Sequence, residues 1–434
     1  MAKKAYLCRQ EQTKLLNPMK QFKLFLASAL LFCLTTTQAQ KYVGGDISLL
    51  PTYEEHGAKY MDKNGQTISD MLAFLKDQGL NAMRVRLFVD PSLASDEAKG
   101  QGVRQDLEYV KALGKRIKDA GMQLLLDFHY SDTWADPANQ STPQLFISVN
   151  TPATEYIYHY TKDCLTALVE AGATPDFIQT GNEITYGMMW DIGCKVEANS
   201  AWDGYKDDHW DSFSTALKNA GKACREVCPN AKIIIHTERI ANIPQVTDYY
   251  QKIDKYGVDY DIIGTSYYPY YHGKMEQLDK ALTQFEANFP NKQIMVVETG
   301  CAYHYKLGDK DQDYPLTYEG QRQFTAELVA TLNKHPKVNG LFWWFLEANE
   351  YGLDWETKRV TDKWYDASLI DNETGCALPA LYELKAFNNG SASIPAVVSE
   401  EASYPWYALD GRMIEGKPTR KGIYINRQDK VVVR

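Results

Sequence analysis

The chain has 434 residues, of which 44% are hydrophobic, 24% charged and 12% aromatic. This composition is globular, because it is too apolar for a disordered chain and too poor in glycine and proline for a fibrous repeat. The net charge of −9, from 47 Lys and Arg against 56 Asp and Glu, argues against nucleic acid or another polyanion as a partner.

The N-terminal segment has the pattern of an export signal. An apolar run from Leu24 to Leu34 follows two lysines and precedes a stretch of small and polar residues that includes Ala39. The run is too short to cross a bilayer, so we expect a signal peptide over residues 1–39, with Met19 as an alternative start. Cys33 lies inside the apolar run and not after a cleavage point, so a lipoprotein signal ranks second. The mature chain is then expected to have no transmembrane segment.

Six cysteines follow the leader, an even number that permits disulfides in an exported protein. Cys224 and Cys228 have the i,i+4 spacing of one helix face, and no second pair of metal-ligating residues lies near them. We expect either a local disulfide or two buried thiols there, and no zinc site.

Short apolar runs bounded by Gly, Pro, Asp or Asn recur along the mature chain and predict strands. Amphipathic segments with helical periodicity separate them, and several of these segments end at a glycine. Eight such units in succession favour a closed parallel barrel, and the absence of a glycine-rich phosphate motif after the first strand disfavours a nucleotide-binding fold. The predicted strands cover residues 42–48, 82–88, 123–129, 177–184, 232–238, 261–268, 293–300 and 340–346.

The predicted fold class is therefore α/β, with a single (β/α)₈ barrel over residues 40–390 that occupies most of the length. Residues 391–434 predict a linker and a small C-terminal β segment, because short alternating runs are broken by LDGR and GKPTRKG. This segment is a small β-module or a strand pair docked on the barrel. It resembles C-terminal segments of exported proteins from Bacteroidetes-type bacteria. We therefore expect a protein that is secreted, periplasmic or on the cell surface of a Gram-negative bacterium.

Polar or aromatic residues end all eight predicted strands, after interiors of Val, Ile and Leu. Barrel enzymes place their catalytic groups at these C-terminal ends, and helix capping alone does not explain eight cases of eight. The strand-end residues are Asp46, Arg84, Arg86, Asp127, His129, Asn182, Glu183, His236, Glu238, Tyr267, Tyr268, Glu298, Trp343 and Trp344.

Two of these residues, Glu183 in TGNEI and Glu298 in VVETG, end the fourth and seventh strands. Those strands face each other across an eight-stranded barrel, so both carboxylates can point into one cleft. Two opposed carboxylates are typical of glycoside hydrolysis, where one protonates the leaving oxygen and the other attacks the anomeric carbon. Either residue alone could instead form a structural salt bridge with Arg84 or Arg86. Asn182 beside Glu183 favours the catalytic interpretation, because an amide there can hold a sugar 2-hydroxyl.

The chain resembles the clan A glycoside hydrolases, and specifically glycoside hydrolase family 53, the arabinogalactan endo-β-1,4-galactanases. The similarity covers most of residues 42–388 and includes GGDIS, NAMRVRLFVDP, LLDFHYSDTWADP, TGNEI, SYYPYYHG, VVETG and GLFWW. It implies a retaining mechanism with Glu183 as proton donor and Glu298 as nucleophile. Matching positions that line the family's cleft, together with Asp46 at the first strand end, give the substrate-binding candidates Asp46, Arg84, Arg86, His129, Trp134, Asn182, His236, Tyr267, Tyr268 and Trp344.

The resemblance also implies the substrate, the neutral β-1,4-galactan of pectic arabinogalactan, cut internally by a monomeric enzyme. A neutral polymer needs no basic groove, which agrees with the net charge. Trp134, Trp343 and Trp344 could stack on sugar rings, although at least one of them is expected in the core.

No cofactor is required for this chemistry. Asp309, Asp311 and Asp313 alternate in LGDKDQDY, and some bacterial relatives hold calcium in the corresponding loop. The alternative for these three residues is a solvated acidic loop.

Two alternative functions remain open from the sequence. Another clan A β-glycanase, a mannanase or a xylanase, would share both glutamates but not the HYSDTWADP segment. A non-catalytic galactan-binding protein would be expected to have lost one of the two glutamates, and both are present.

Overall fold

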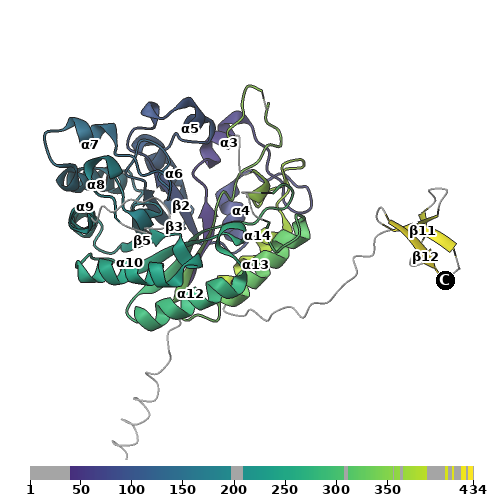
Figure 1. Ribbon diagram of the computed structural model, residues 1–434. Coiled ribbons are helices and arrows are strands. Elements are labelled where there is room, and N and C mark those ends of the chain that lie inside the picture. The colour runs from purple at the N-terminus through teal and green to yellow at the C-terminus, as the bar shows by residue number, and fades with distance from the viewer. Residues whose placement is uncertain are drawn as a thin grey trace, which may run out of the picture.

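The computed structural model describes residues 40–196, 209–306, 311–354, 356–361 and 365–388, together with strand backbones between residues 406 and 433. Eight parallel strands close into a barrel in sequence order, which confirms the predicted (β/α)₈ fold (Figure 1). Each strand falls within two residues of its predicted start. The strands are β1 (Tyr42–Asp46), β2 (Ala82–Leu87), β3 (Gln123–Phe128), β4 (Phe177–Thr180), β5 (Lys232–Thr237), β6 (Ile262–Tyr267), β7 (Gln293–Thr299) and β8 (Val338–Trp343).

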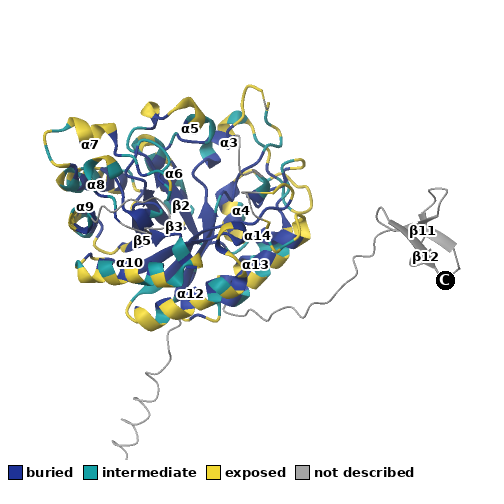
Figure 2. Cartoon of the chain, in the orientation of Figure 1, coloured by how far each residue is buried: buried dark blue, intermediate teal, exposed yellow. Residues whose placement is uncertain are grey.

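Helices connect the strands and form the outer layer, with buried inner faces and exposed outer faces (Figure 2). Side chains of Asp70, Asp106 and Thr317 accept backbone N–H groups at the first turns of α4, α6 and α13, which fixes where these helices begin. The α-helices are α3 (Leu50–His56), α4 (Met71–Asp77), α5 (Asp96–Gly100), α6 (Leu107–Asp119), α7 (Gln144–Ser148), α8 (Ala153–Glu170), α9 (Trp210–Val227), α10 (Ile243–Lys255), α11 (Pro269–His272), α12 (Met275–Asn288), α13 (Tyr318–Leu332), α14 (Pro379–Glu383) and α15 (Lys385–Asn388). Short 3₁₀ turns are η1 (Pro91–Leu93), η2 (Ile184–Tyr186), η3 (Trp190–Ile192), η4 (Arg239–Ala241) and η5 (Tyr365–Ala367).

The barrel interior is layered, because successive strand residues face opposite sides of the sheet. On β2, Ala82 packs in the apolar floor, and Arg84 and Arg86 follow on the same side of the strand. The same two-residue step leads from floor residues to polar residues on β3, β4 and β5, where Asp127, Gln179 and His236 follow. The floor consists of Ala82, Leu125, Phe177, Ile234, Ile262, Met295, Val297 and Phe342.

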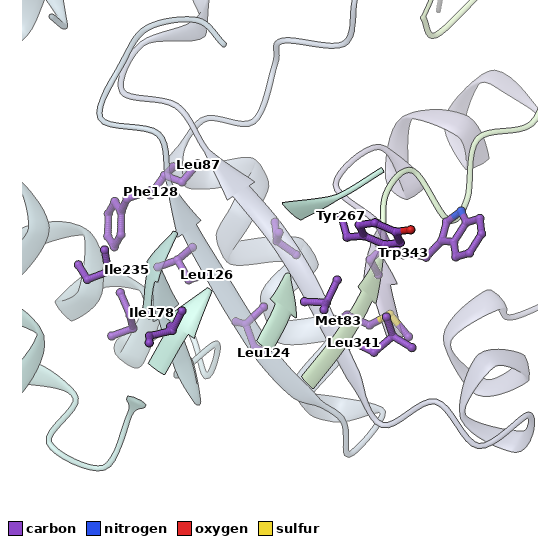
Figure 3. Close-up of a cluster of buried hydrophobic side chains, with 14 of the residues drawn as sticks. Met83, Leu87, Leu124, Leu126, Phe128, Ile178, Ile235, Tyr267, Leu341 and Trp343 are labelled. Atoms are coloured by element: carbon purple, nitrogen blue, oxygen red, sulfur yellow. The ribbon is translucent and has the colours of Figure 1, made fainter. Parts of the chain in front are cut away.

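Residues of the opposite strand faces pack against the helices and form the larger core. Figure 3 shows part of this core, where Leu124, Leu126 and Ile178 lie among other buried apolar side chains. The interior below the strand ends is therefore filled by apolar side chains on both sides of the sheet.

The C-terminal segment contains β9 (Trp406–Ala408), β10 (Met413–Ile414), β11 (Gly422–Asn426) and β12 (Asp429–Val433). They form an antiparallel sheet in the order β10-β9-β11-β12, so this segment is a small β-module. The predicted signal peptide, residues 1–39, lies outside the described residues, and the domain boundaries at 39 and 390 stay predictions. None of the described helices combines the length and the apolar character that a membrane crossing requires.

All six cysteines that follow residue 39 are described, and each is a free thiol. Cys224 and Cys228 are buried near the end of α9, so of the two expected alternatives the structure has the pair of buried thiols.

Candidate active site

A cavity of about 800 Å³ opens at the C-terminal ends of the barrel strands. The strand ends and the loops that follow β2 to β8 contribute to its wall. Of the twelve residues predicted to be catalytic or to bind substrate, eight line it: Arg86, His129, Trp134, Asn182, Glu183, Tyr268, Glu298 and Trp344.

Glu183 follows β4 in a left-handed backbone conformation, with φ of 47° and ψ of 50°. This conformation is uncommon for a residue with a side chain, and such residues concentrate at functional sites. The Ser266 hydroxyl donates to Glu183 Oε1 at 2.6 Å. Burial and the charges of Glu298 and Glu238 raise the pKa of Glu183 well above its usual value, which outweighs the opposing hydrogen bond from Ser266. Glu183 is therefore suited to hold a proton at neutral pH.

Glu298 ends β7 beside a cation and a phenol. Arg84 Nη2 lies 2.8 Å from Glu298 Oε1, and the Tyr268 hydroxyl donates to Oε2 at 3.1 Å. The pairing of β6 with β7 is irregular after Thr265, which allows both Val297 and Glu298 to face the interior. Burial raises the pKa of Glu298 to about 7, while the charge of Arg84 and the hydrogen bond from Tyr268 lower it.

The two arginines of β2 have different partners. Arg84 also contacts Asp46 Oδ2 at 2.9 Å and Asp127 Oδ2 at 2.7 Å, whereas Arg86 contacts Asp46 Oδ1 at 2.8 Å. Arg84 therefore accounts for the expected ion pair with Glu298, and Arg86 holds Asp46 instead. The carboxylates that surround Arg84 raise the pKa of its guanidinium, so this buried group stays a cation.

Asn182 and His236 orient the end of β4. Asn182 Nδ2 donates to the Ala135 carbonyl at 2.8 Å, and its Oδ1 accepts from Arg84 Nη2 at 2.9 Å. The backbone N–H of Glu183 donates to His236 Nδ1 at 3.3 Å, so the ring proton is on Nε2, which lies 2.9 Å from the Ser266 hydroxyl. A hydrogen-bond chain then runs from His236 through Ser266 to Glu183. Burial lowers the pKa of His236 well below its usual value, so this ring is neutral.

Aromatic rings form one wall of the cavity. The guanidinium of Arg86 lies 4.8 Å from the ring centres of both Trp134 and Phe345. Trp344 stacks on Phe345 with ring centres 4.1 Å apart and meets Trp134 edge-on at 6.3 Å. Flat apolar faces beside hydrogen-bonding groups suit the binding of a sugar ring.

The other four predicted substrate-binding residues do not line the cavity, and all are buried: Asp46, Arg84, His236 and Tyr267. The first three lie just beneath it in the ion-pair and hydrogen-bond network. Tyr267 faces the helices instead, where its ring stacks on Phe324 at 6.1 Å and its hydroxyl donates to the Gly273 carbonyl. Its neighbour Tyr268 faces the cavity, because adjacent strand residues point to opposite sides.

Trp343 and Trp344 divide in the same way. Trp343 is fully buried, donates to the Ala367 carbonyl and packs on Phe324, while Trp344 lines the cavity. Figure 3 shows Tyr267 and Trp343 within the buried cluster. The expectation that at least one of the three tryptophans belongs to the core is confirmed.

Several residues that line the cavity are not among the predicted catalytic or substrate-binding residues, although one of them, Glu238, belongs to the strand-end residues named from the sequence. Glu238 accepts from the Thr185 hydroxyl at 2.6 Å and lies 2.6 Å from Arg239 Nη2. Its position two residues after His236 places it on the same side of the chain, a signal that was available. The loop residues carry no comparable pattern. The others are Ser95, Glu97, Ala98, Gln101, Thr133, Ala135, Asp136, Pro137, Ala138, Asn139, Arg239, Ala241, Tyr271 and His272.

The predicted calcium ligands do not come together in the described residues. Asp309 lies outside them, Asp311 contacts Lys306 Nζ at 2.9 Å, and Asp313 lies 4.0 Å from Lys274 Nζ. Across the described ranges, no three or more His, Cys, Asp or Glu side chains are grouped so that they could hold a metal ion.

Known proteins share this architecture. The family model described as glycosyl hydrolase family 53 matches residues 42–384. A protein of Niallia circulans from the region 5′ of bgaB is 35% identical over 70% of this chain and 82% of its own. The endo-β-1,4-galactanase of Bacillus subtilis is 27% identical, with coverage of 80% and 86%.

Among solved structures, the GH53 catalytic domain of Ignisphaera aggregans superposes with a TM-score of 0.69 at 30% identity. The match covers 82% of this chain and 98% of that domain, so the shared part includes the whole barrel of the relative. From the barrel, the paired glutamates and these matches it follows that the chain belongs to glycosyl hydrolase family 53.

Proposed function

We propose that this protein is an endo-β-1,4-galactanase that hydrolyses galactan and type I arabinogalactan by a retaining double displacement. The observation that carries the proposal is the contrast between two glutamates that line one cavity. Glu298 lies against a cation, and Glu183 lies against a neutral hydroxyl with other carboxylates nearby. The names of relatives such as the Bacillus subtilis enzyme supply the substrate.

In the first step, the carboxylate of Glu298 attacks the anomeric carbon while Glu183 gives its proton to the glycosidic oxygen. The bond from the anomeric carbon to that oxygen breaks, a glycosyl ester forms on Glu298, and the shortened chain leaves as an alcohol. Because Ser266 occupies Oε1 of Glu183, the proton is held at Oε2.

In the second step, Glu183 is a carboxylate and accepts a proton from water, whose oxygen attacks the anomeric carbon. The ester bond to Glu298 breaks, and both glutamates return to their starting protonation states. The pKa of Glu183 falls once Glu298 is esterified, because the negative charge of Glu298 is one cause of its elevation. The same residue can therefore serve first as acid and then as base.

The network beneath the cavity supports these steps. The second N–H of the Asn182 amide can donate to the sugar 2-hydroxyl, an interaction that strengthens in the transition state. Trp134 and Trp344 offer ring surfaces to the sugar, and Arg84 keeps the Glu298 carboxylate oriented towards the anomeric carbon.

The experiment offers purified protein galactan, mannan and xylan separately and measures the sizes of the products. We expect short oligosaccharides from galactan at early times and no release from the other two. Release from mannan or xylan without release from galactan would contradict the substrate, and binding to galactan without cleavage would identify a carbohydrate-binding protein. Proton NMR of the first product tests the mechanism, since retention predicts that the β-anomer appears first.

We further propose that the chain is exported by cleavage near residue 39, in a Gram-negative cell, and acts as a monomer. N-terminal sequencing of the mature protein tests the cleavage, cell fractionation tests the compartment, and light scattering tests the mass. Calcium in the loop of Asp309 is not part of the chemistry. A melting temperature that is the same with and without EDTA would exclude it.

A further inference from the structure

The catalytic cavity continues into a second hollow of about 480 Å³. The two share Ala241, Tyr271 and His272, so the boundary between them lies at the segments after β5 and β6. Beyond that boundary, the second hollow is lined by Gly273 and by residues at the start of α12, among them Gln277. The cleft therefore extends past the catalytic cavity on this side.

Tyr271 lies at the junction of the two hollows with 45% of its surface exposed. Tyr270 meets its ring at 4.7 Å and 71°, and Tyr268 meets it at 6.2 Å and 77°. Both contacts are of the T-shaped kind, and Tyr271 keeps its exposed surface while it lines both hollows. An exposed flat ring in a polysaccharide cleft can pack against the apolar face of a sugar.

The backbone that carries Tyr271 is held in place. Pro269 begins α11, the backbone N–H of Tyr268 donates to His272 Nδ1 at 3.0 Å, and Gly273 ends the turn with φ of 84°. A ring on such a turn is ordered before the ligand arrives, so less conformational entropy is lost on binding.

The position of Glu183, the proposed acid, indicates which part of the substrate lies beside Tyr271. A general acid protonates the leaving oxygen, so the leaving sugar lies beside Glu183. Ser266 on β6 holds the Glu183 carboxylate, and Glu238 at the end of β5 adds its charge on the same side. The segments after β5 and β6 therefore form the wall next to the acid. Residues of α5, which follows β2, line the cavity across the barrel from β6.

We propose that Tyr271 is a stacking platform for the sugars of the leaving chain beyond the first, so that the cleft binds several units on the reducing-end side of the scissile bond. This proposal rests on the proposed galactanase function. It makes Tyr271 a binding residue that does not touch the reacting atoms, and its contribution depends on the length of the leaving group.

The experiment compares two substrates that differ in the leaving group. Galactan carries sugars into the second hollow, whereas the aglycone of 4-nitrophenyl β-1,4-galactotrioside ends at the first position. We expect Tyr271→Ala to lower the ratio of kcat/KM on galactan to kcat/KM on the nitrophenyl substrate by roughly threefold to tenfold. Tyr271→Phe, which keeps the ring, should retain the wild-type ratio.

Matched variants separate binding from folding. Tyr305→Ala removes another exposed tyrosine, one that lines neither hollow, and is expected to retain the wild-type ratio. Tyr271→Leu keeps apolar bulk without a flat ring, so it tests stacking even if the alanine variant does not fold. With galactobiose added as acceptor, the ratio of transfer to hydrolysis should also fall in Tyr271→Leu, because the acceptor occupies the leaving-group side.

Two outcomes overturn the proposal. An equal loss on both substrates would place Tyr271 on the glycosyl side or give it only a structural role, and a wild-type ratio in both Tyr271→Ala and Tyr271→Leu would remove it from the cleft. A wild-type protein inactive on galactan would instead reject the proposed function, which is a different result.

Discussion

The ends of β4 and β7 carry the same side chain in different surroundings. Glu298 ends β7 in an extended strand, within reach of the Arg84 cation and the Tyr268 hydroxyl. Glu183 follows β4 in a left-handed turn, bonded to the Ser266 hydroxyl and close to the charge of Glu238. Burial raises the pKa of both carboxyls, and among the described residues only Glu298 has a cation in contact that opposes it. The environment thus gives two identical groups different surroundings, as the proposed roles of acid and nucleophile require.

The largest expected effect comes from exchanging each glutamate for its amide. Glu298→Gln should lower kcat by about 10⁵-fold on every substrate, because the covalent step loses its nucleophile. Glu183→Gln should lower kcat on galactan by a comparable amount. On a dinitrophenyl galactobioside, the rate at which Glu183→Gln forms the glycosyl ester should fall far less, because that leaving group needs no proton.

Pre-steady-state kinetics on the dinitrophenyl substrate checks this contrast. Glu183→Gln should release a burst of dinitrophenol and then stall at the glycosyl ester, and mass spectrometry should find the sugar on Glu298. A burst in Glu298→Gln, or its absence in Glu183→Gln, would mean that the two roles are assigned the wrong way round.

The second largest effect is expected from removing the Arg84 cation. Arg84 is fully buried and touches three carboxylates, those of Asp46, Asp127 and Glu298. Arg84→Met would leave them uncompensated, and losing one partner of a buried charge network costs about 3–5 kcal/mol of stability. We also expect kcat/KM on galactan to fall by at least about 10²-fold, because Glu298 would lose its orientation and become harder to ionise.

A surface arginine provides the control for this variant. Arg116 pairs with Glu54 at 2.7 Å, and the two side chains are 40% and 34% exposed. Arg116→Met should cost no more than about 1 kcal/mol and leave turnover unchanged. Equal losses of stability for the two variants, measured by urea unfolding, would contradict the importance given to the buried network.

A smaller effect is expected on the pH dependence of activity, which should have one limb at acidic pH and one at basic pH. Activity should fall as the pH drops through the pKa of Glu298, about 7, because the nucleophile gains a proton, and it should fall at higher pH as Glu183 loses its proton. Tyr268→Phe removes a hydrogen bond that lowers the pKa of Glu298, so the acid limb should move up by about 0.5–1 pH unit. Ser266→Ala removes one that lowers the pKa of Glu183, so the basic limb should move up instead.

The kcat/KM profile from pH 4 to 10 checks both shifts. Tyr318→Phe is the control, since its hydroxyl donates to Asp371 in a different part of the protein and neither limb should move. If Tyr268→Phe moved the basic limb or Ser266→Ala moved the acid limb, the two carboxyls would be in the reverse roles.

The sequence predicted the barrel because eight apolar runs alternate with amphipathic helices, and eight such units in succession favour a closed barrel. It also predicted both glutamates, which end opposite strands. It did not separate Tyr267 from Tyr268, and it selected Trp344 rather than Trp343 only through the family resemblance. Adjacent residues of a strand face opposite sides of the sheet. The sequence alone does not show which of two adjacent aromatic residues at a strand end faces the cavity.

The loops limited the prediction further. Tyr271, Arg239 and the residues of α5 line the cleft only because their backbones fold back over the barrel, and no periodic signal marks such positions. Glu298 itself faces inward through an irregular pairing of β6 with β7, where simple alternation from Val297 would turn it away. The sequence could name this residue by its motif but could not predict that geometry.

The smallest effect on turnover is expected at a third buried carboxyl, which shows what burial does without a catalytic partner. Glu347 follows β8, is fully buried and accepts the Leu49 backbone N–H at 2.8 Å, and burial raises its pKa to about 8. Below about pH 4.5 the group is protonated in the folded and unfolded chains alike. Between about 4.5 and 8 the folded protein keeps a proton that the unfolded chain releases, so stability falls as the pH rises.

Glu347→Gln removes this dependence while keeping the acceptor for Leu49. The variant should gain about 1–3 kcal/mol over the wild type between pH 5 and pH 8, with turnover changed less than about twofold. Urea unfolding at both pH values measures the gain, and Glu356→Gln, at an exposed position, is the control that should show none. A gain that is the same at both pH values would mean that Glu347 is ionised in the folded protein. Burial alone would then not be enough to hold a proton on a carboxyl in this barrel, and the protonation of Glu183 would have to depend on the charges of Glu238 and Glu298.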